Sequence, residues 1–169
     1  MGNFIREHKK DIISYAITVA VVFGIIWTSR LFITPLVVSG HSMDNTLSNG
    51  MFGYALKTKN DTEIERCDIV IAYAEDHYII KRVIGLPGET VSEKNGIVYI
   101  NGEPLEEPYT STSTNDFDEI TLGEDEYFLL GDNRQNSKDS REIGPVKKEC
   151  IKAKGFFVIN SLDHFGVAK

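Results

Sequence analysis

Two residues of this chain, Ser42 and Lys81, have a type and setting that suggest chemistry. Ser42 follows Gly40 and His41, and a glycine there lets the backbone turn sharply and approach another segment closely. Lys81 comes 39 residues later, within the apolar run Tyr78–Ile84. A serine hydroxyl needs a base to become a nucleophile, and a neutral lysine amine can be that base. The pair therefore suggests acyl transfer, although most serines beside a glycine belong to ordinary turns.

The lysine shares one face of its predicted strand with apolar neighbours. Because side chains alternate along a strand, Ile79, Lys81 and Val83 point to the same side. An exposed lysine has a pKa of about 10.4, so less than about one part in a thousand is neutral at pH 7. Desolvation can lower such a pKa to roughly 7–8 and so provide a working base. The alternative is a lysine that extends to solvent from an edge strand.

Histidines offer a second kind of base. His41 adjoins Ser42, but the side chains of chain neighbours usually point apart, so its imidazole would reach the hydroxyl poorly. His77 and His164 lie in no recognisable motif, and we interpret both as surface residues.

A polar run from Gly131 to Arg141 follows the predicted strand Tyr127–Leu130. Its turn-forming residues indicate a loop. A calcium-binding loop would need more acidic residues at alternate positions and a closing glutamate.

The two cysteines, Cys67 and Cys150, are too few for a metal site. We therefore expect no metal or cofactor, and the cysteines form either one disulfide or two separate thiols.

The segment 12–29 contains no charged residue and predicts a transmembrane helix. As a helix its 18 residues span about 27 Å, close to the roughly 30 Å of bilayer hydrocarbon. It is apolar on every face, unlike a core helix, and Trp27 lies near its end, where interfacial aromatics collect. A cleaved signal peptide would have a shorter apolar region that ends in small residues, yet positions 21–40 contain no alanine. We expect a retained anchor.

Charges beside this helix predict its orientation. Three basic residues precede it, whereas only Arg30 follows it before Lys57. Positive charge favours the cytoplasmic side, so we expect residues 1–11 to be cytoplasmic. Residues 30–36 would be a membrane-proximal linker, and residues 37–169 an extracytoplasmic catalytic domain of the cell membrane protein.

Short runs rich in Val, Ile, Tyr and Phe alternate with turn signals after Pro35 and predict a mostly β fold. Asn95-Gly96 and Asn101-Gly102 favour tight hairpin turns. We expect an antiparallel, barrel-like domain. The predicted strands are Met51–Lys57, Asp68–Tyr73, Tyr78–Ile84, Glu89–Glu93, Ile97–Ile100, Tyr127–Leu130 and Gly155–Ile159.

Acidic residues dominate the β part of the chain. From Leu31 onward there are 14 Lys and Arg against 23 Asp and Glu, a net charge of −9, which disfavours nucleic-acid binding. Residues 103–126 hold nine acids and no Lys or Arg, so we expect an exposed acidic loop there.

Four blocks of the sequence, in order, resemble the bacterial type I signal peptidases, and in particular the short form of Gram-positive bacteria. These are membrane-anchored Ser-Lys proteases that remove signal peptides from exported proteins. With the anchor, the resemblance covers nearly the whole chain. The blocks are Ser39–Leu47, Asp68–Val70, Lys81–Gly88 and Gly131–Arg141.

The resemblance implies a role for each matching residue. Ser42 would be the nucleophile and Lys81 the general base. Ser137 would hydrogen-bond Lys81, and a salt bridge between Asp139 and Arg141 would brace the site. The backbone N–H of Ser42, in the oxyanion region with Gly40, would stabilise the developing negative charge.

The resemblance also implies partners. Substrates would be exported preproteins with small residues at the first and third positions before the cut. The anchor would lie in the lipid bilayer, and the protein would be monomeric, with a possible association with the secretion machinery.

Four residues depart from the family pattern, and two rival functions stay open. Asn45 stands where the family usually has proline, and Gly40 offers no hydroxyl to an oxyanion. Cys67 stands where glycine usually precedes the aspartate, and Ile143 replaces a more usual aromatic. One rival is a self-cleaving protease of the SOS-repressor kind, which also uses Ser and Lys but is cytoplasmic. The other is a catalytically weakened, membrane-tethered β domain that acts as a binding or scaffolding module.

Overall fold

The computed structural model describes residues 8–159 and 165–167, and the chain divides into two compact units, residues 1–33 and 34–169. The first unit is helix α2 (Lys9–Ser29), which contains the predicted 12–29 segment. Its stretch Lys10–Ser29 has a mean hydropathy of 2.0 and is long and apolar enough to cross a membrane. The hydroxyls of Thr18 and Thr28 donate to carbonyls four residues earlier, so these polar groups are satisfied within the helix.

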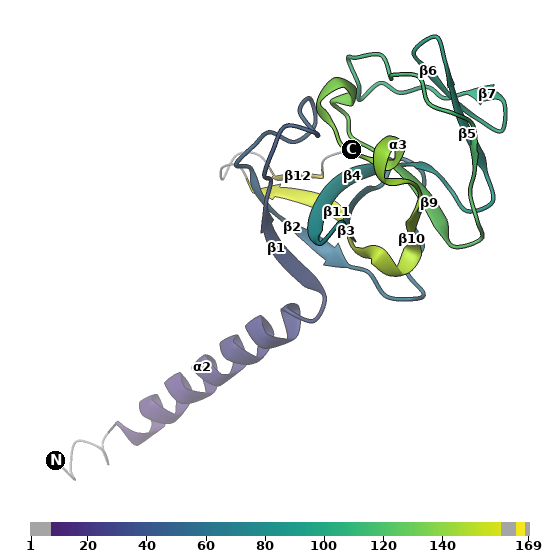
Figure 1. Ribbon diagram of the computed structural model, residues 1–169. Coiled ribbons are helices and arrows are strands. Elements are labelled where there is room, and N and C mark those ends of the chain that lie inside the picture. The colour runs from purple at the N-terminus through teal and green to yellow at the C-terminus, as the bar shows by residue number, and fades with distance from the viewer. Residues whose placement is uncertain (1–7, 160–164, 168–169) are drawn as a thin grey trace. The chain divides into compact units, whose positions relative to one another are not determined.

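The second unit is built around an eight-stranded sheet, in which every pair with a defined register is antiparallel (Figure 1). Within the described ranges the first and last strands of this order do not pair, so the sheet is open and the expected barrel is not closed. The order is β1 (Ile33–Val37), β2 (Phe52–Lys57), β11 (Ile151–Ile159), β3 (Ile69–Ala74), β4 (His77–Gly85), β9 (Glu126–Leu130) and β10 (Val146–Lys147), with β12 (Phe165–Val167) paired to β11.

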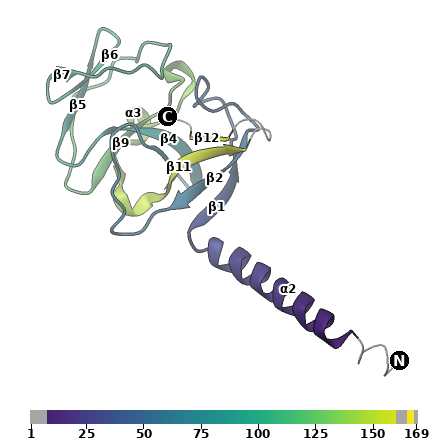
Figure 2. The same cartoon turned by 180° about the vertical axis from the view of Figure 1, so that it is seen from behind.

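A second, four-stranded sheet lies to one side of the first, as both views of the ribbon show (Figures 1 and 2). Both predicted hairpin turns are confirmed, because Asn95, Gly96, Asn101 and Gly102 have φ values of 56°, 85°, 52° and 86°. The strand order is β7 (Glu103–Pro104), β6 (Ile97–Ile100), β5 (Thr90–Lys94) and β8 (Ile120–Thr121).

The seven predicted strands are all present, with ends shifted by up to four residues. The largest shift is at β11, which begins at Ile151 and not at Gly155. Strand β1 was not predicted, because Pro35 lies in its centre and proline is found in sheets mainly on edge strands. Short helical turns complete the fold: η1 (Arg134–Asn136), α3 (Ser140–Ile143) and η2 (Lys148–Cys150).

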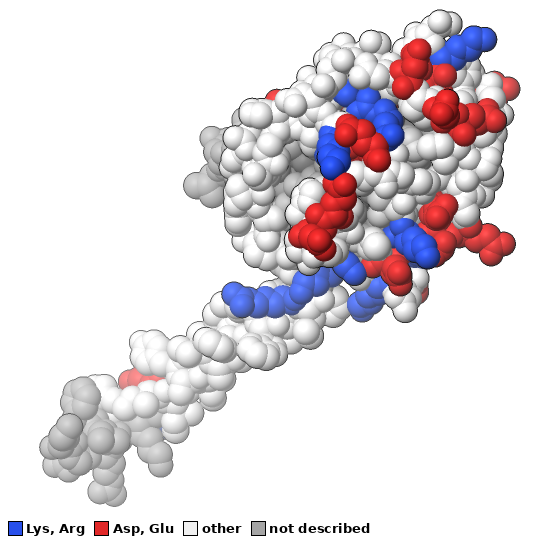
Figure 3. Space-filling view, viewed as in Figure 1, with Lys and Arg blue, Asp and Glu red and all other residues white. Residues whose placement is uncertain are grey.

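The acidic segment 103–126 is mostly exposed, as its composition predicts, and seven of its nine acids are exposed. Glu107 is an exception, because its carboxylate forms an ion pair with the buried Arg134. Thr114 and Leu122 are also buried. On the face of the β unit seen in Figure 3, acidic and basic side chains adjoin one another in small groups.

Candidate active site

Ser42 lies in the turn that connects β1 to β2. The side chains of Met43 and Leu47 hold this turn against the core, because both are fully buried in a cluster with Ile69 and Phe156. Gly40 adopts a φ of +100°, a conformation that disfavours other residue types, and its N–H donates to Asn49 Oδ1 at 3.0 Å.

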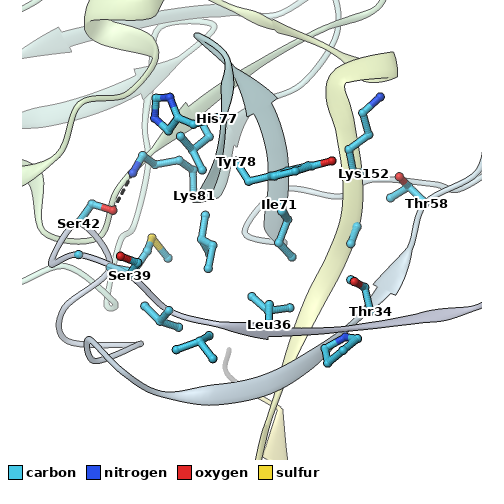
Figure 4. Close-up of a pocket in the computed structure, with 18 of the residues that line it drawn as sticks. Thr34, Leu36, Ser39, Ser42, Thr58, Ile71, His77, Tyr78, Lys81 and Lys152 are labelled. Atoms are coloured by element: carbon cyan, nitrogen blue, oxygen red, sulfur yellow. Dashed lines mark hydrogen bonds between the residues drawn. The ribbon is translucent and has the colours of Figure 1, made fainter. Parts of the chain in front are cut away.

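Lys81 reaches the serine from β4. Its Nζ donates to Ser42 Oγ at 2.7 Å (Figure 4). The lysine is only 4% exposed, and its strand is held by β3, where Val70 pairs with it. The two residues that the sequence singles out for chemistry therefore lie in direct contact.

Burial gives Lys81 the properties of a base. Desolvation lowers the pKa of Lys81 from 10.5 to about 8, and the positive charge of Arg141 acts in the same direction. The negative charges of Asp139 and Asp132 partly oppose this by favouring the ammonium. With a pKa of about 8, about a tenth of the amines are neutral at pH 7, and a neutral amine can accept the Ser42 proton.

The loop Gly131–Ser137 holds the backbone of the serine turn. The Asn133 N–H donates to the Ser42 carbonyl at 3.0 Å, and Asn133 Nδ2 donates to the His41 carbonyl at 3.0 Å. Among the hydrogen bonds of the described residues, the Ser42 N–H has no acceptor. A donor in that state is available to a developing oxyanion.

Ser137, Asp139 and Arg141 form a compact network beside Gly131. Arg141 donates from Nε and Nη2 to the two carboxylate oxygens of Asp139 at 2.8 and 2.9 Å, and Asp139 is fully buried. Ser137 Oγ and the Gly131 N–H both donate to Asp139 Oδ2, at 2.7 and 3.0 Å. The bond between Ser137 and Lys81 that the family resemblance implies is not among the hydrogen bonds of the described residues.

The histidines do not contact the serine hydroxyl within the described ranges. His41 Nδ1 lies 2.9 Å from Asp44 Oδ2, and more than half of its side chain is exposed. His77 lines the same groove as Ser42, which its sequence context does not indicate. His164 lies outside the described residues.

Both cysteines, Cys67 and Cys150, are free thiols.

A buried ion pair that the sequence did not indicate connects the parts of the site. Arg82 points to the face opposite Lys81 and donates from Nε and Nη2 to the carboxylate of Asp132 at 2.8 and 2.7 Å. Thr46 Oγ1, in the serine turn, donates to the same carboxylate at 2.5 Å. Alternation along the strand predicts the direction of Arg82 but gives no sign that its charge is buried.

A groove of about 790 Å³ extends from the Ser-Lys pair. Ser42 and Lys81 lie at one end, and Thr58 and Lys152 at the other (Figure 4). Its apolar lining includes a row of neighbours across β4, β3 and β11, together with one residue of β1: Ile80, Ile71, Ala153 and Leu36.

Two strand edges without a partner border this groove. In the described part of the chain, β4 pairs with β9 only from Arg82 to Gly85, so the stretch His77–Lys81 has a free edge. In the same part of the chain, β1 is an edge strand of its sheet and also lines the groove. Free edges of this kind can bind an extended peptide by adding it as a strand.

Comparisons with known proteins agree with this geometry. The family model described as signal peptidase, peptidase S26, matches residues 10–160. Signal peptidase I S of Bacillus subtilis (strain 168) is 38% identical over 166 residues, which are 89% of this chain and 90% of the relative. Signal peptidase IB of Staphylococcus aureus (strain COL) is 33% identical, with 88% and 90% covered.

A solved structure is also similar. The crystal structure of a signal peptidase I from Enterococcus faecalis V583 matches with a TM-score of 0.51 and 34% identity, over 54% of this chain and 96% of the other. On the family model and the two curated relatives, this chain belongs to the signal peptidase family, peptidase S26.

Proposed function

We propose that this protein is a membrane-bound serine endopeptidase that removes N-terminal signal peptides from exported preproteins. The observation that carries the proposal is the 2.7 Å contact between Lys81 Nζ and Ser42 Oγ at one end of a groove bordered by free strand edges. Membership of the signal peptidase family supports the same reaction. The SOS-repressor-type rival and the binding module find no support in the relatives, which are signal peptidases.

The reaction begins with proton transfer from the serine. Neutral Lys81 accepts the proton of the Ser42 hydroxyl while Oγ attacks the scissile carbonyl, and the Ser42 N–H donates to the resulting oxyanion. The Lys81 ammonium then protonates the departing amine, and the C–N bond breaks to leave an acyl-enzyme on Ser42. A water molecule, deprotonated by the now neutral Lys81, attacks the ester, and the proton returns to Ser42 as the signal peptide leaves.

Ser137, Asp139 and Arg141 act through Lys81 and the backbone. The carboxylate of Asp139 stabilises the Lys81 ammonium that forms in each half-reaction, and Arg141 prevents Asp139 from raising the pKa of Lys81 further. The Ser137 hydroxyl and the Gly131 N–H both donate to the Asp139 carboxylate and so orient it.

The groove is where we expect the small residues before the cut to bind. Because the groove extends from Ser42 towards Thr58 and Lys152, residues on one side of the scissile bond fill it. An extended peptide places alternate side chains on one face. We expect the first and third residues before the cut to point towards the apolar lining, which includes Met43, Leu36 and Ile80.

Helix α2 anchors the enzyme in the bilayer. The three basic residues before the helix favour a cytoplasmic N-terminus, with the β unit outside. Substrates emerge from the membrane on that side, so the anchor confines the enzyme to the same surface as the cleavage points. We expect a monomer that acts beside the secretion machinery.

A cleavage assay tests this function. The full chain, in detergent, is incubated with a purified precursor that carries a signal peptide, and the products are identified by mass spectrometry. We expect one cut after a small-x-small site with the wild type and none with Ser42→Ala or Lys81→Ala. Absence of a cut on several precursors, or a cut that survives in either variant, would exclude the proposal.

A further inference from the structure

The segment Glu107–Asn115, here called the strap, lies against the loop that holds Ser42. Its main anchor is the buried Arg134, which donates to both carboxylate oxygens of Glu107 and to Thr114 Oγ1. Gln135 Nε2 adds bonds to the Ser113 carbonyl at 2.9 Å and to Asn115 Oδ1 at 3.0 Å. Because a buried charge is costly without its partner, Arg134 fixes the strap to this loop.

The loop that the strap contacts is the one that holds the serine turn. Arg134 Nε donates to the Gly131 carbonyl at 3.0 Å, and the neighbouring Asn133 N–H donates to the Ser42 carbonyl at 3.0 Å. Glu107 in the strap is therefore connected to the Ser42 backbone through Arg134 and its chain neighbour Asn133.

A direct contact also joins the strap to the serine turn. Asn45 Nδ2 donates to Ser111 Oγ at 3.1 Å, across 66 residues of sequence. Asn45 adopts a φ of +93°, which proline, fixed near −65°, cannot adopt. The turn of this chain therefore has a backbone that excludes proline at this position, and a side-chain bond to the strap.

A third contact supports the buried ion pair beneath the turn. The ring of Tyr109 lies 4.1 Å from the Arg82 guanidinium, in cation–π geometry. The same guanidinium bonds to Asp132 and, at 3.3 Å, to Thr46 Oγ1 of the serine turn. Tyr109 thus packs on the Arg82 guanidinium, which bonds to Thr46 in the serine turn.

We propose that the strap positions the serine turn, with Ser111 and Tyr109 as positioning residues for Ser42. The proposal builds on the peptidase function. No strap residue is among those that line the groove, so the strap contributes to the placement of the nucleophile and not to substrate binding. Misplacement of a nucleophile by a fraction of an ångström slows attack without weakening binding. The strap therefore affects kcat and leaves KM nearly unchanged.

Variants of the direct contact give the first test, with the full chain in detergent and a signal-peptide precursor. Ser111→Ala and Asn45→Gly each remove the bond, and glycine tolerates the positive φ. We expect each to lower kcat about three- to tenfold, as for loss of one hydrogen bond, with KM within about twofold. The double variant should be no slower than the slower single variant, because both changes remove the same bond.

Matched controls separate positioning from general damage. Ser113→Ala removes a hydroxyl of the same strap for which no hydrogen bond is described, while its backbone carbonyl still accepts from Gln135, so kcat should not change. Tyr109→Leu removes the ring over Arg82 and should lower kcat, whereas Tyr109→Phe keeps the ring, loses only the hydroxyl's bond to Glu107 at 3.0 Å, and should lower kcat less. Equal kcat in Ser111→Ala and Ser113→Ala, or additive effects of Ser111→Ala and Asn45→Gly, would overturn the proposal.

Amide hydrogen exchange of residues 40–47 gives a readout that does not need turnover. We expect faster exchange in Ser111→Ala than in Ser113→Ala, because the turn loses its link to the strap. Equal exchange would show that the strap does not hold the turn, even if the wild type cleaves precursors. If the wild type cleaved nothing while exchange still depended on Ser111, the peptidase function would fail and the link between strap and turn would stand.

Discussion

Arg82 and Asp132, 50 residues apart in the chain, form a buried ion pair with two hydrogen bonds, at 2.8 and 2.7 Å. Their side chains are 1% and 0% exposed. The pair joins the strand that carries Lys81 to the loop that holds Ser42, and Thr46 adds the serine turn to the same carboxylate. The geometry of the Ser42–Lys81 pair therefore depends on a buried ion pair that does not contact the Ser42 hydroxyl.

Removal of one partner of this pair should be costly. Arg82→Met leaves Asp132 buried without its partner, and we expect the free energy of unfolding to fall by about 3–5 kcal/mol. Arg82→Met with Asp132→Leu should recover part of that loss but little activity, because the second change removes the carboxylate that accepts from Thr46. Urea denaturation in detergent measures both variants. A double variant no more stable than Arg82→Met would contradict this account.

Burial of Lys81 should make folding depend on pH in a defined window. Because folding lowers the pKa of Lys81 from 10.5 to about 8, the unfolded chain binds more protons between these values, and stability rises with pH there. Below pH 8 the burial costs about 3 kcal/mol. Lys81→Met should therefore be more stable than wild type at pH 7, and the difference should shrink towards pH 10.5. A difference that does not vary with pH would be inconsistent with a depressed pKa.

Gly131 permits the close approach of the loop to the serine turn. A Cβ at this position would lie 2.5 Å from the Ser42 carbonyl and would also collide with Ser137 Oγ. We expect Gly131→Ala to lower kcat at least about a hundredfold, because the turn must move. Gly85→Ala is the matched control, since its Cβ would meet Val91 Cγ2 at 2.5 Å, in an apolar cluster that contains no residue of the serine turn. It should lower the melting temperature while the folded fraction keeps its kcat; equal activity loss in both variants would refute the role of Gly131.

The backbone of the serine turn should reject proline at position 45. Since Asn45 has a φ of +93° and proline needs about −65°, Asn45→Pro must distort the turn. We expect a larger loss of kcat than in Asn45→Gly, measured on the same precursor at saturating concentration. Activity equal to or above wild type in Asn45→Pro would contradict this, because it would show that the turn functions with a negative φ at position 45.

Much of the site follows from local sequence. The apolar neighbours of Lys81 on its strand face predict a desolvated amine, and the structure has it 4% exposed. Asn95-Gly96 and Asn101-Gly102 predict hairpins because the turn chemistry is confined to two residues. The apolar segment 12–29 predicts the helix because its pattern needs no tertiary partner.

Contacts between distant segments could not be predicted in the same way. The burial of Glu107 depends on Arg134, and composition around Glu107 indicates only a solvated loop. Strand β1 needs a neighbouring strand to form, and Pro35 argues against it locally. The bond between Asn45 and Ser111 joins residues 66 apart, so the sequence around Asn45 does not indicate its partner.

The pH dependence of kcat/KM tests the Ser42–Lys81 account most directly, because kcat/KM reports the ionisation of the free enzyme. Since the neutral amine is the active form, the account predicts a rise with pH that is half complete at about pH 8, and no activity at any pH in Lys81→Arg, whose guanidinium stays protonated. A rise centred near pH 6.5, the ordinary pKa of histidine, or an active Lys81→Arg variant, would contradict it.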